Sequence, residues 1–140
     1  MIHYPAKINY SRTDKTYIVS FPDLPGCLTY GGSLAEALEN AIEALSGYLE
    51  SIDLRKITVP KPSRLTGKNI HNIRPEKRVA FALWLKIKRA ERGFSQKDMA
   101  RMLNINFQSY QKYENPRKTN PTLKTIEKVE NVFGERVLSL

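Results

Sequence analysis

The residue types that carry chemistry in enzymes are sparse in this sequence and are not grouped. Hydrolysis assisted by two divalent metal ions needs several carboxylates gathered on one surface. Here Asp14 lies in a predicted turn, Asp23 follows a predicted strand, and no predicted strand interior carries an acidic residue. His3 and His71 are isolated and lack the spacing of metal ligands. The sequence therefore predicts no catalytic residue, no metal site and no cofactor.

The single cysteine and the short apolar runs indicate an ordinary soluble protein. The single cysteine, Cys27, excludes an internal disulfide and is interpreted as a small buried hydrophobe. The longest apolar run, 79–85, is far shorter than the roughly 20 residues that a membrane helix needs. No basic region followed by an apolar stretch marks an export signal near Met1. We therefore expect a cytoplasmic protein that does not enter the membrane.

Positive charge is concentrated in one half of the 140-residue chain. Residues 1–65 contain seven basic and seven acidic residues, whereas residues 66–140 contain sixteen basic and seven acidic residues, so the net charge of +9 lies in the second half. A basic half beside a neutral half suggests that one part binds a polyanion and the other does something else. The alternative is that the charge serves only solubility.

The most specific pattern is a pair of short helices predicted over residues 95–114. Ser95 is a predicted N-cap, Ala100 is small where a second helix must approach, and Asn104 lies at a turn that requires positive φ. Two helices joined in this way hold the second at roughly 90–120° to the first, where it can enter a DNA major groove. Residues 79–134 resemble the Xre/Cro family of helix-turn-helix domains, with Asn104 and Pro116 at positions where that family commonly has glycine.

That resemblance assigns roles to particular side chains. In such domains the outward residues at the start of the second helix read base edges, so Gln108 is expected to pair with adenine, Lys112 with guanine and Phe107 with a thymine methyl group. An alternative for Phe107 is that it belongs to the core. Gln96 matches the family position that bonds phosphate, and the residues after the second helix are expected to hold the DNA backbone. The complete set of predicted DNA-binding residues is Gln96, Asn106, Phe107, Gln108, Lys112, Arg117 and Lys118.

The first half of the chain predicts a small α+β layer. Apolar residues alternate over 2–10 and 17–21, which indicates strands, and a short strand is expected over 27–30 before Gly31 and Gly32. Ser33 begins a helix through the box Ser33-Leu34-Ala35-Glu36, and the residues 57–59 are expected to return as a fourth strand at the sheet edge. This gives a β-β-β-α-β order with one helix on one face of the sheet.

Proline, glycine and small polar residues predict the boundary between the two halves. We expect a first domain over residues 1–60, a linker over 61–75 and an all-α helix-turn-helix domain over 76–140. The fold class is thus α+β followed by all-α. Helices in the second domain are expected to end near Gly93 and Gly134.

The motifs at residues 21–27, 31–38 and 41–45 resemble the HicB antitoxin domain. The resemblance covers about residues 1–62 and implies a degenerate RNase H-like fold. It also implies a partner, the small mRNA-cleaving toxin HicA, which has a double-stranded-RNA-binding-like fold. Antitoxins of this type usually carry a C-terminal DNA-binding domain that represses their own operon, in agreement with the helix-turn-helix pattern. The exposed helix acids and the loop 21–26 are the candidate contacts with the toxin.

The predicted function is therefore a non-enzymatic antitoxin that inhibits a HicA-like toxin and represses its operon as a homodimer or higher oligomer. Dimerisation is expected because two-fold proteins match palindromic half-sites. Two alternatives remain open at this stage. One is a stand-alone repressor whose first domain senses a ligand or oligomerises, and the other is a nuclease that retains RNase H-like activity.

Overall fold

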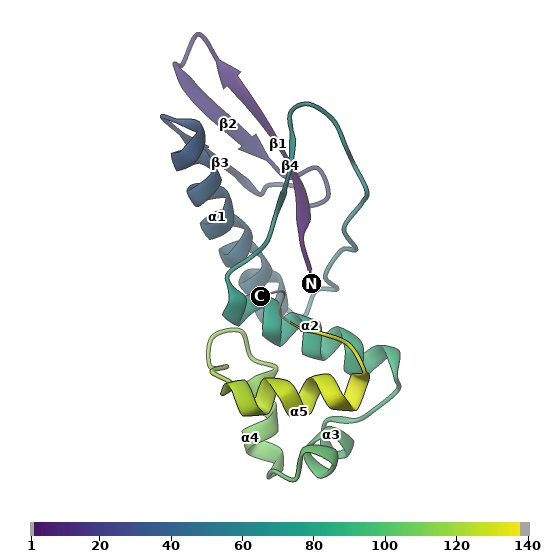
Figure 1. Ribbon diagram of the computed structural model, residues 1–140. Coiled ribbons are helices and arrows are strands. Elements are labelled where there is room, and N and C mark those ends of the chain that lie inside the picture. Colours follow the sequence, from purple (N-terminus) through teal and green to yellow (C-terminus); the bar gives the residue numbers. More distant parts are fainter. Residues whose placement is uncertain (1, 138–140) are drawn as a thin grey trace. The chain divides into compact units, whose positions relative to one another are not determined.

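The computed structural model describes residues 2–137 and divides into two compact units, residues 2–76 and residues 77–137 (Figure 1). The first unit is a four-stranded antiparallel sheet with one helix, and the second consists of helices. The α+β fold class is therefore confirmed. No helix among the described residues is long and apolar enough to cross a membrane.

The sheet of the first unit has the strand order β3-β2-β1-β4. Burial alternates in the middle of β1 as the sequence predicts, because Ala6 and Ile8 are buried while Lys7 and Asn9 are exposed, whereas Pro5 is also buried and Tyr10 is exposed. The strands are β1 (Tyr4–Ser11), β2 (Thr16–Ser20), β3 (Leu28–Gly31) and β4 (Ile70–Ile73).

Helix α1 (Leu34–Leu54) covers the buried face of this sheet. Ser33 is its N-cap, and the Ser33 hydroxyl accepts a hydrogen bond of 3.1 Å from the amide of Glu36. The helix approaches β3 so closely that a Cβ atom on Gly31 would lie 2.4 Å from the amide nitrogen of Ala37. Its buried stripe has the predicted helical spacing and consists of Ala37, Ala41, Leu45, Ser46, Leu49 and Ile52.

The position of the fourth strand differs from the prediction. Residues 57–59 form no strand, and β4 instead lies at Ile70–Ile73, inside the segment 61–75 that was expected to be a linker. Two prolines, Pro60 and Pro62, follow residues 57–59 directly and lack the amide hydrogen that a ladder needs. The chain therefore runs on and pairs later, with Tyr4 opposite Ile73 and Lys7 opposite Ile70.

The segment between α1 and β4 is held to the sheet by side-chain and backbone hydrogen bonds. The Tyr4 hydroxyl donates to the Pro60 carbonyl at 2.6 Å, and the Ser63 amide donates to the Asp23 carboxylate at 2.8 Å. Burial raises the pKa of Tyr4 to about 12, with a further contribution from the charge of Asp23. Asp23 thus fastens this crossing segment to the turn after β2.

The second unit contains helices α2 (Lys77–Glu91), α3 (Gln96–Leu103), α4 (Phe107–Tyr113) and α5 (Leu123–Phe133) within residues 77–137. Gly93 and Gly134 adopt φ values of 69° and 67°, so both helix ends fall where the sequence predicts them. Trp84 packs edge-to-face on Phe133, with ring centroids 5.5 Å apart. The core is built mainly from Phe81, Trp84, Leu85, Met99, Leu103, Tyr110, Val129 and Phe133.

Candidate nucleic-acid interface

The turn between α3 and α4 is fixed by local hydrogen bonds that the sequence encodes. Ser95 caps α3 in a complete capping box, since its hydroxyl accepts from the Asp98 amide at 2.9 Å and the Asp98 carboxylate accepts from the Ser95 amide at 2.8 Å. These bonds hold the pKa of Asp98 below its ordinary value. Asn104 ends α3 in the left-handed conformation, with φ 55° and ψ 48°. The predicted helix-turn-helix geometry is thus present.

Asn106 has a structural task in addition to its predicted one. It is the N-cap of α4, and its side-chain oxygen accepts a hydrogen bond of 2.7 Å from the Ser109 amide. The cap fixes the direction in which α4 begins. Its expected contact with a base edge stays a prediction.

A buried ion pair joins α2 to the end of α4. The Arg89 guanidinium donates to the Glu114 carboxylate twice, from Nε at 2.6 Å and from Nη2 at 3.0 Å. Arg89 also donates to the Phe94 carbonyl at 3.0 Å, and the buried Tyr110 hydroxyl donates to Glu114. Burial and the bond to Glu114 raise the pKa of Tyr110 well above its ordinary range. Glu114, only 3% exposed, is therefore the point at which α2 and α4 are fastened together.

The Glu114 carboxylate also positions Gln96, the residue of α3 that is predicted to bind a DNA phosphate. Gln96, the first residue of α3, donates from Nε2 to Glu114 Oε1 at 3.2 Å. Gln111 of α4 donates in turn to Gln96 Oε1 at 3.4 Å. The structure thus brings Gln96 beside α4, as a shared DNA surface requires. The sequence patterns assign no role to Arg89, Gln111 or Glu114, the residues that hold Gln96 in this position.

The other predicted residues lie on α4 and in the loop that follows it. Gln108 and Lys112 are exposed and one helical turn apart, so they share a face of α4. Phe107 is partly buried and lies outside the buried core cluster, with the Lys97 ammonium 5.8 Å from the centre of its ring. Arg117 and Lys118 are exposed after the helix. All these positions are accessible to a ligand in this chain.

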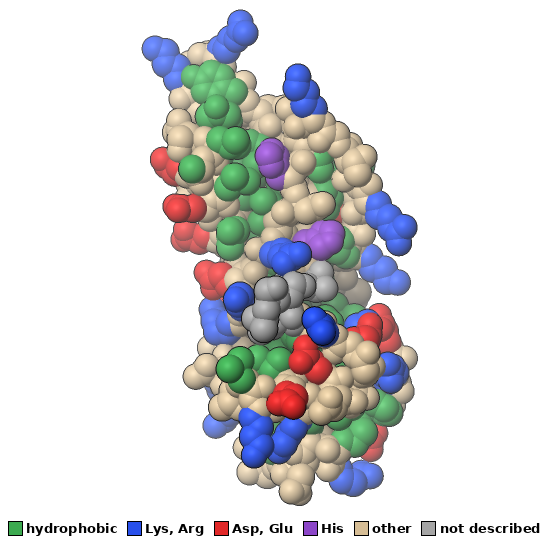
Figure 2. Space-filling model, in the orientation of Figure 1, with side chains coloured by type: hydrophobic (Ala, Val, Ile, Leu, Met, Phe, Trp, Pro, Cys, Tyr) green, Lys and Arg blue, Asp and Glu red, His purple; other side chains and the backbone are tan. Residues whose placement is uncertain are grey.

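The charge of the unit suits a polyanion. Residues 77–137 contain fourteen basic and six acidic residues, a net charge of +8. Several of the acids are paired, among them Glu114 with Arg89 and both Glu91 and Glu135 with Lys88. Basic side chains are spread over the visible surface of the helical unit (Figure 2). A helix with an exposed face on a unit of this charge can bind the major groove and the flanking phosphates.

The described part of the chain, including the first unit, contains no group of side chains suited to hold a metal ion. Among residues 2–137 no group of three His, Cys, Asp or Glu side chains is close enough together to hold a metal ion. Cys27 is buried, and its thiol lies 3.7 Å from the Ala44 carbonyl; burial raises the pKa of Cys27 to about 11.

Comparison with protein families agrees with this geometry. The model of the HicB-like antitoxins of bacterial toxin–antitoxin systems matches residues 4–109, and a helix-turn-helix model matches residues 85–139. The chain belongs to the HicB-like antitoxin family. It also carries a helix-turn-helix unit, and both resemblances drawn from its sequence are confirmed.

Two relatives match part of this HicB-like chain. An uncharacterized 14.9 kDa protein from the rep–hol intergenic region of Haemophilus phage HP1 is 43% identical over 49 residues, which cover 35% of each chain. A UPF0150 protein of Thermoplasma acidophilum is 42% identical over 48 residues, covering 34% of this chain and 70% of that one. The match thus spans about a third of the phage protein's length.

Two solved structures are also similar to the HicB-like chain. The N-terminal domain of the Burkholderia pseudomallei antitoxin HicB is 20% identical, with a TM-score of 0.47, and the match covers 54% of this chain and 99% of that domain. A toxin–antitoxin complex from Streptococcus pneumoniae is 20% identical, with a TM-score of 0.48, and the match covers 70% and 92% of the two chains.

Proposed function

We propose that this HicB-like antitoxin inhibits a HicA-like mRNA-cleaving toxin through its first unit and represses its own operon through its second. The observation that carries the proposal is the join, in one chain, of the family's sheet-and-helix unit to a basic helix-turn-helix unit. The first unit acts without catalysis, by covering the toxin. We extend the toxin-binding domain to residue 76, because β4 belongs to its sheet.

The second unit binds operator DNA as part of a homodimer in the cytoplasm. Gln108 and Lys112 read base edges from α4, while Gln96, Arg117 and Lys118 hold phosphates on either side. Two copies place two recognition helices in successive major grooves, about one turn of DNA apart. Leu123 on α5 is 81% exposed, which supports the C-terminal helices as the dimer interface.

The test uses the full-length chain, DNA from upstream of its own gene and the short gene for a basic protein that the proposal expects beside it. The double variant Gln108→Ala/Lys112→Ala is expected to lose operator binding in a mobility-shift assay and still protect cells from the toxin. Lys61→Ala, which removes an exposed charge from the segment between α1 and β4, is the control and should retain both activities. Simultaneous loss of both activities in a folded double variant contradicts the assignment of separate tasks to the two units.

The same experiment distinguishes the proposed antitoxin from the alternative function, a stand-alone repressor. If the wild-type chain binds operator DNA but the adjacent gene product is harmless to cells, the protein is a repressor and not an antitoxin.

A further inference from the structure

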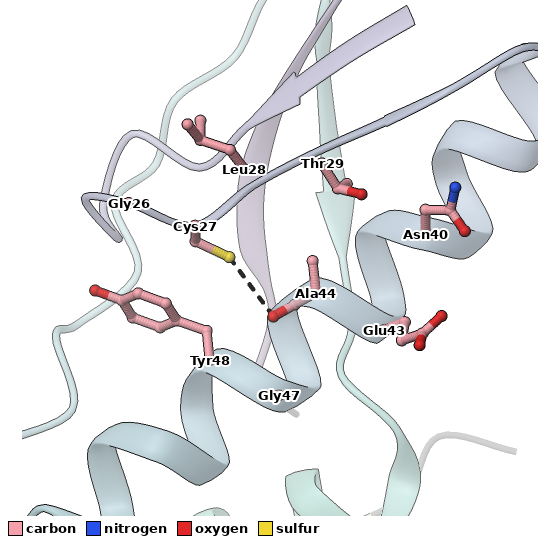
Figure 3. A pocket seen from close by; sticks show the side chains of 9 residues that line it. All are labelled: Gly26, Cys27, Leu28, Thr29, Asn40, Glu43, Ala44, Gly47 and Tyr48. Carbon is pink, nitrogen blue, oxygen red and sulfur yellow. Dashed lines mark hydrogen bonds between the residues drawn. The ribbon is translucent and has the colours of Figure 1, made fainter.

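A groove follows the open edge of the sheet in the first unit. Strand β3 is the last strand on its side of the sheet, and beside it a groove of about 500 Å³ separates the segment 26–29 from α1. The helical wall consists of Asn40, Glu43, Ala44, Gly47 and Tyr48 (Figure 3). Between the larger side chains of Tyr48 and Glu43 the wall is low, because Ala44 and Gly47 present almost no side chain. The groove is therefore open to an extended chain laid along β3.

A second hollow lies on the opposite side of the same strand. It has a volume of about 510 Å³ and is lined largely by apolar side chains, with Ile18, Leu28 and Tyr30 exposed by 42%, 65% and 70%. The two hollows share Leu28 and Thr29. Because side chains alternate in direction along a strand, a strand added to β3 would place its side chains in the two hollows in turn.

One hydrogen bond marks the edge as available. The Asn40 side-chain amide donates to the Tyr30 carbonyl at 2.8 Å, so a side chain satisfies this edge acceptor in place of a neighbouring strand. The residue is partly buried and lines the groove itself. The backbone amide of an incoming strand could replace the Asn40 side chain as the donor, so the Tyr30 carbonyl would keep a hydrogen-bond partner.

The charge around the groove defines the occupant. Helix α1 carries five acidic residues and neither lysine nor arginine, although the chain as a whole has a net charge of +9. Acidic side chains gather along the flank of the unit where α1 lies (Figure 2). Asp14 adds a further acid at the second hollow. Opposite charge accelerates encounter and excludes wrong partners, so the groove favours a basic segment.

Both a second copy and the opposite sheet edge fit less well. Two-fold pairing of β3 with its own copy would place two acidic α1 helices on one face of a joined sheet, where like charges repel. At the other edge, the hollow beside β4 is lined by Arg74, which follows β4, and by His3, which precedes β1, and Ile73 is only 5% exposed. Neither the charge nor the apolar surface of that edge matches a basic strand.

We propose that the toxin docks on β3, adding an extended basic segment to the sheet between α1 and the exposed side chains of Leu28 and Tyr30. This inference rests on the proposed function, because it assumes that the chain binds a toxin and says where the toxin binds. Backbone bonds to β3 hold the segment, its basic side chains face Glu39 and Glu43, and its apolar side chains pack on Leu28.

The test measures binding of the full-length chain to an inactivated form of the HicA-like protein that the proposed function expects to be encoded beside it. Leu28→Asp and, separately, Glu43→Lys are expected to weaken binding by about tenfold or more. Leu54→Asp, at a side chain that is 55% exposed at the far end of α1, and Glu127→Lys in the second unit are the matched controls and should change binding less than about twofold. In the wild-type complex, amide hydrogen exchange should slow over residues 28–31 and stay unchanged over residues 70–73.

The outcomes separate the docking site from the function. If the wild type binds the toxin, but both variants bind equally well and exchange over β3 is unchanged, the docking site is wrong and the antitoxin function stands. Protection of β3 in the absence of toxin, with a mass of two copies, assigns the edge to self-association and overturns the proposal. If the wild type does not bind the toxin at all, the proposed function fails and the docking site fails with it.

Discussion

Arg89 of α2 donates two hydrogen bonds, of 2.6 Å and 3.0 Å, to the carboxylate of Glu114 at the end of α4. Glu114 is almost completely buried and also accepts from Tyr110 and Gln96, so a single carboxylate receives donors from three helices. Helix α4 is thereby fixed to the body of its unit by a fully partnered charge. This pair adds a tertiary restraint at the end of a helix of only seven residues, whose start is set by the Asn106 cap.

Replacing this charge is expected to destabilise the helical unit. In Glu114→Gln, the Arg89 charge loses its counterion while remaining mostly enclosed, and we expect a loss of about 2–4 kcal/mol in the free energy of unfolding. Trp84 is the only tryptophan and belongs to this core, so its fluorescence during urea unfolding reports on this unit. Glu135→Gln breaks an exposed pair with Lys88 and should cost less than about 1 kcal/mol. Equal losses in the two variants would contradict the special role of Glu114.

Salt dependence separates the phosphate contacts from the base contacts. Lys118→Ala is expected to lower the slope of log affinity against log salt concentration by about 0.9 for each phosphate contact removed. Gln108→Ala should leave that slope unchanged and reduce discrimination between operator and mismatched DNA by about 1–3 kcal/mol. Titration of fluorescent operator DNA at several salt concentrations measures both quantities. An unchanged slope in Lys118→Ala removes that residue from the interface.

The features that the sequence predicts correctly are local ones. The alternation of β1, the cap at Ser33, the box Ser95–Asp98 and the left-handed Asn104 each depend on residues a few positions apart. Short-range patterns of this kind determine backbone direction before any tertiary contact forms. For that reason the elements of the helix-turn-helix unit could be placed to within a few residues.

The missed features depend on contacts between distant residues. Strand β4 has only four residues, two of them the polar His71 and Asn72, and it pairs with a strand more than sixty positions earlier. The Arg89–Glu114 pair spans twenty-five positions, so its two residues cannot be matched by a short-range pattern. One signal was available: Glu114 follows the inward Tyr110 by four positions and therefore shares its side of α4. Which residues read DNA depends on the ligand itself and stays a prediction.

Cys27 provides a test of packing in the first unit. Burial favours the neutral thiol and raises its pKa from 9.0 to about 11. At pH 8 the thiolate fraction is then about 100-fold smaller than in the unfolded chain, so iodoacetamide should modify the native protein at least 100-fold more slowly. Mass spectrometry of native and urea-unfolded samples measures the two rates. The variant Cys27→Ala/Leu28→Cys, with an exposed thiol, should react rapidly in the folded state.

The same shift makes the stability of the first unit depend on alkaline pH. A thiol whose pKa is higher in the folded state stabilises that state fully below pH 9, and this contribution is lost as the pH rises from 9 towards 11. Tyr4, with a pKa raised from 10.0 to about 12, extends the loss to higher pH. Urea unfolding followed by circular dichroism should therefore show the unit weakening above pH 9 in the wild type and less so in Cys27→Ala.

The end of the first unit can be located by truncation. A fragment that ends at Pro62 lacks β4 and leaves the edge of β1 unpaired from Tyr4 to Lys7. It also loses the buried Ile73 and the 2.9 Å hydrogen bond from the Glu76 amide to the Ser46 hydroxyl. Burial of one isoleucine alone contributes roughly 1.5–3 kcal/mol, a large part of the stability of a unit of this size.

We therefore expect the fragment 1–76 to unfold cooperatively and the fragment 1–62 to lack a cooperative transition in circular dichroism. The fragment 1–76 should also retain toxin binding, since β3 and the whole of α1 lie within it. Ile73→Ala in the fragment 1–76 is the intermediate case, with β4 present but its buried side chain cut back. If 1–62 gives the same dispersed NMR spectrum as 1–76, β4 is dispensable, and the unit ends where the prolines begin.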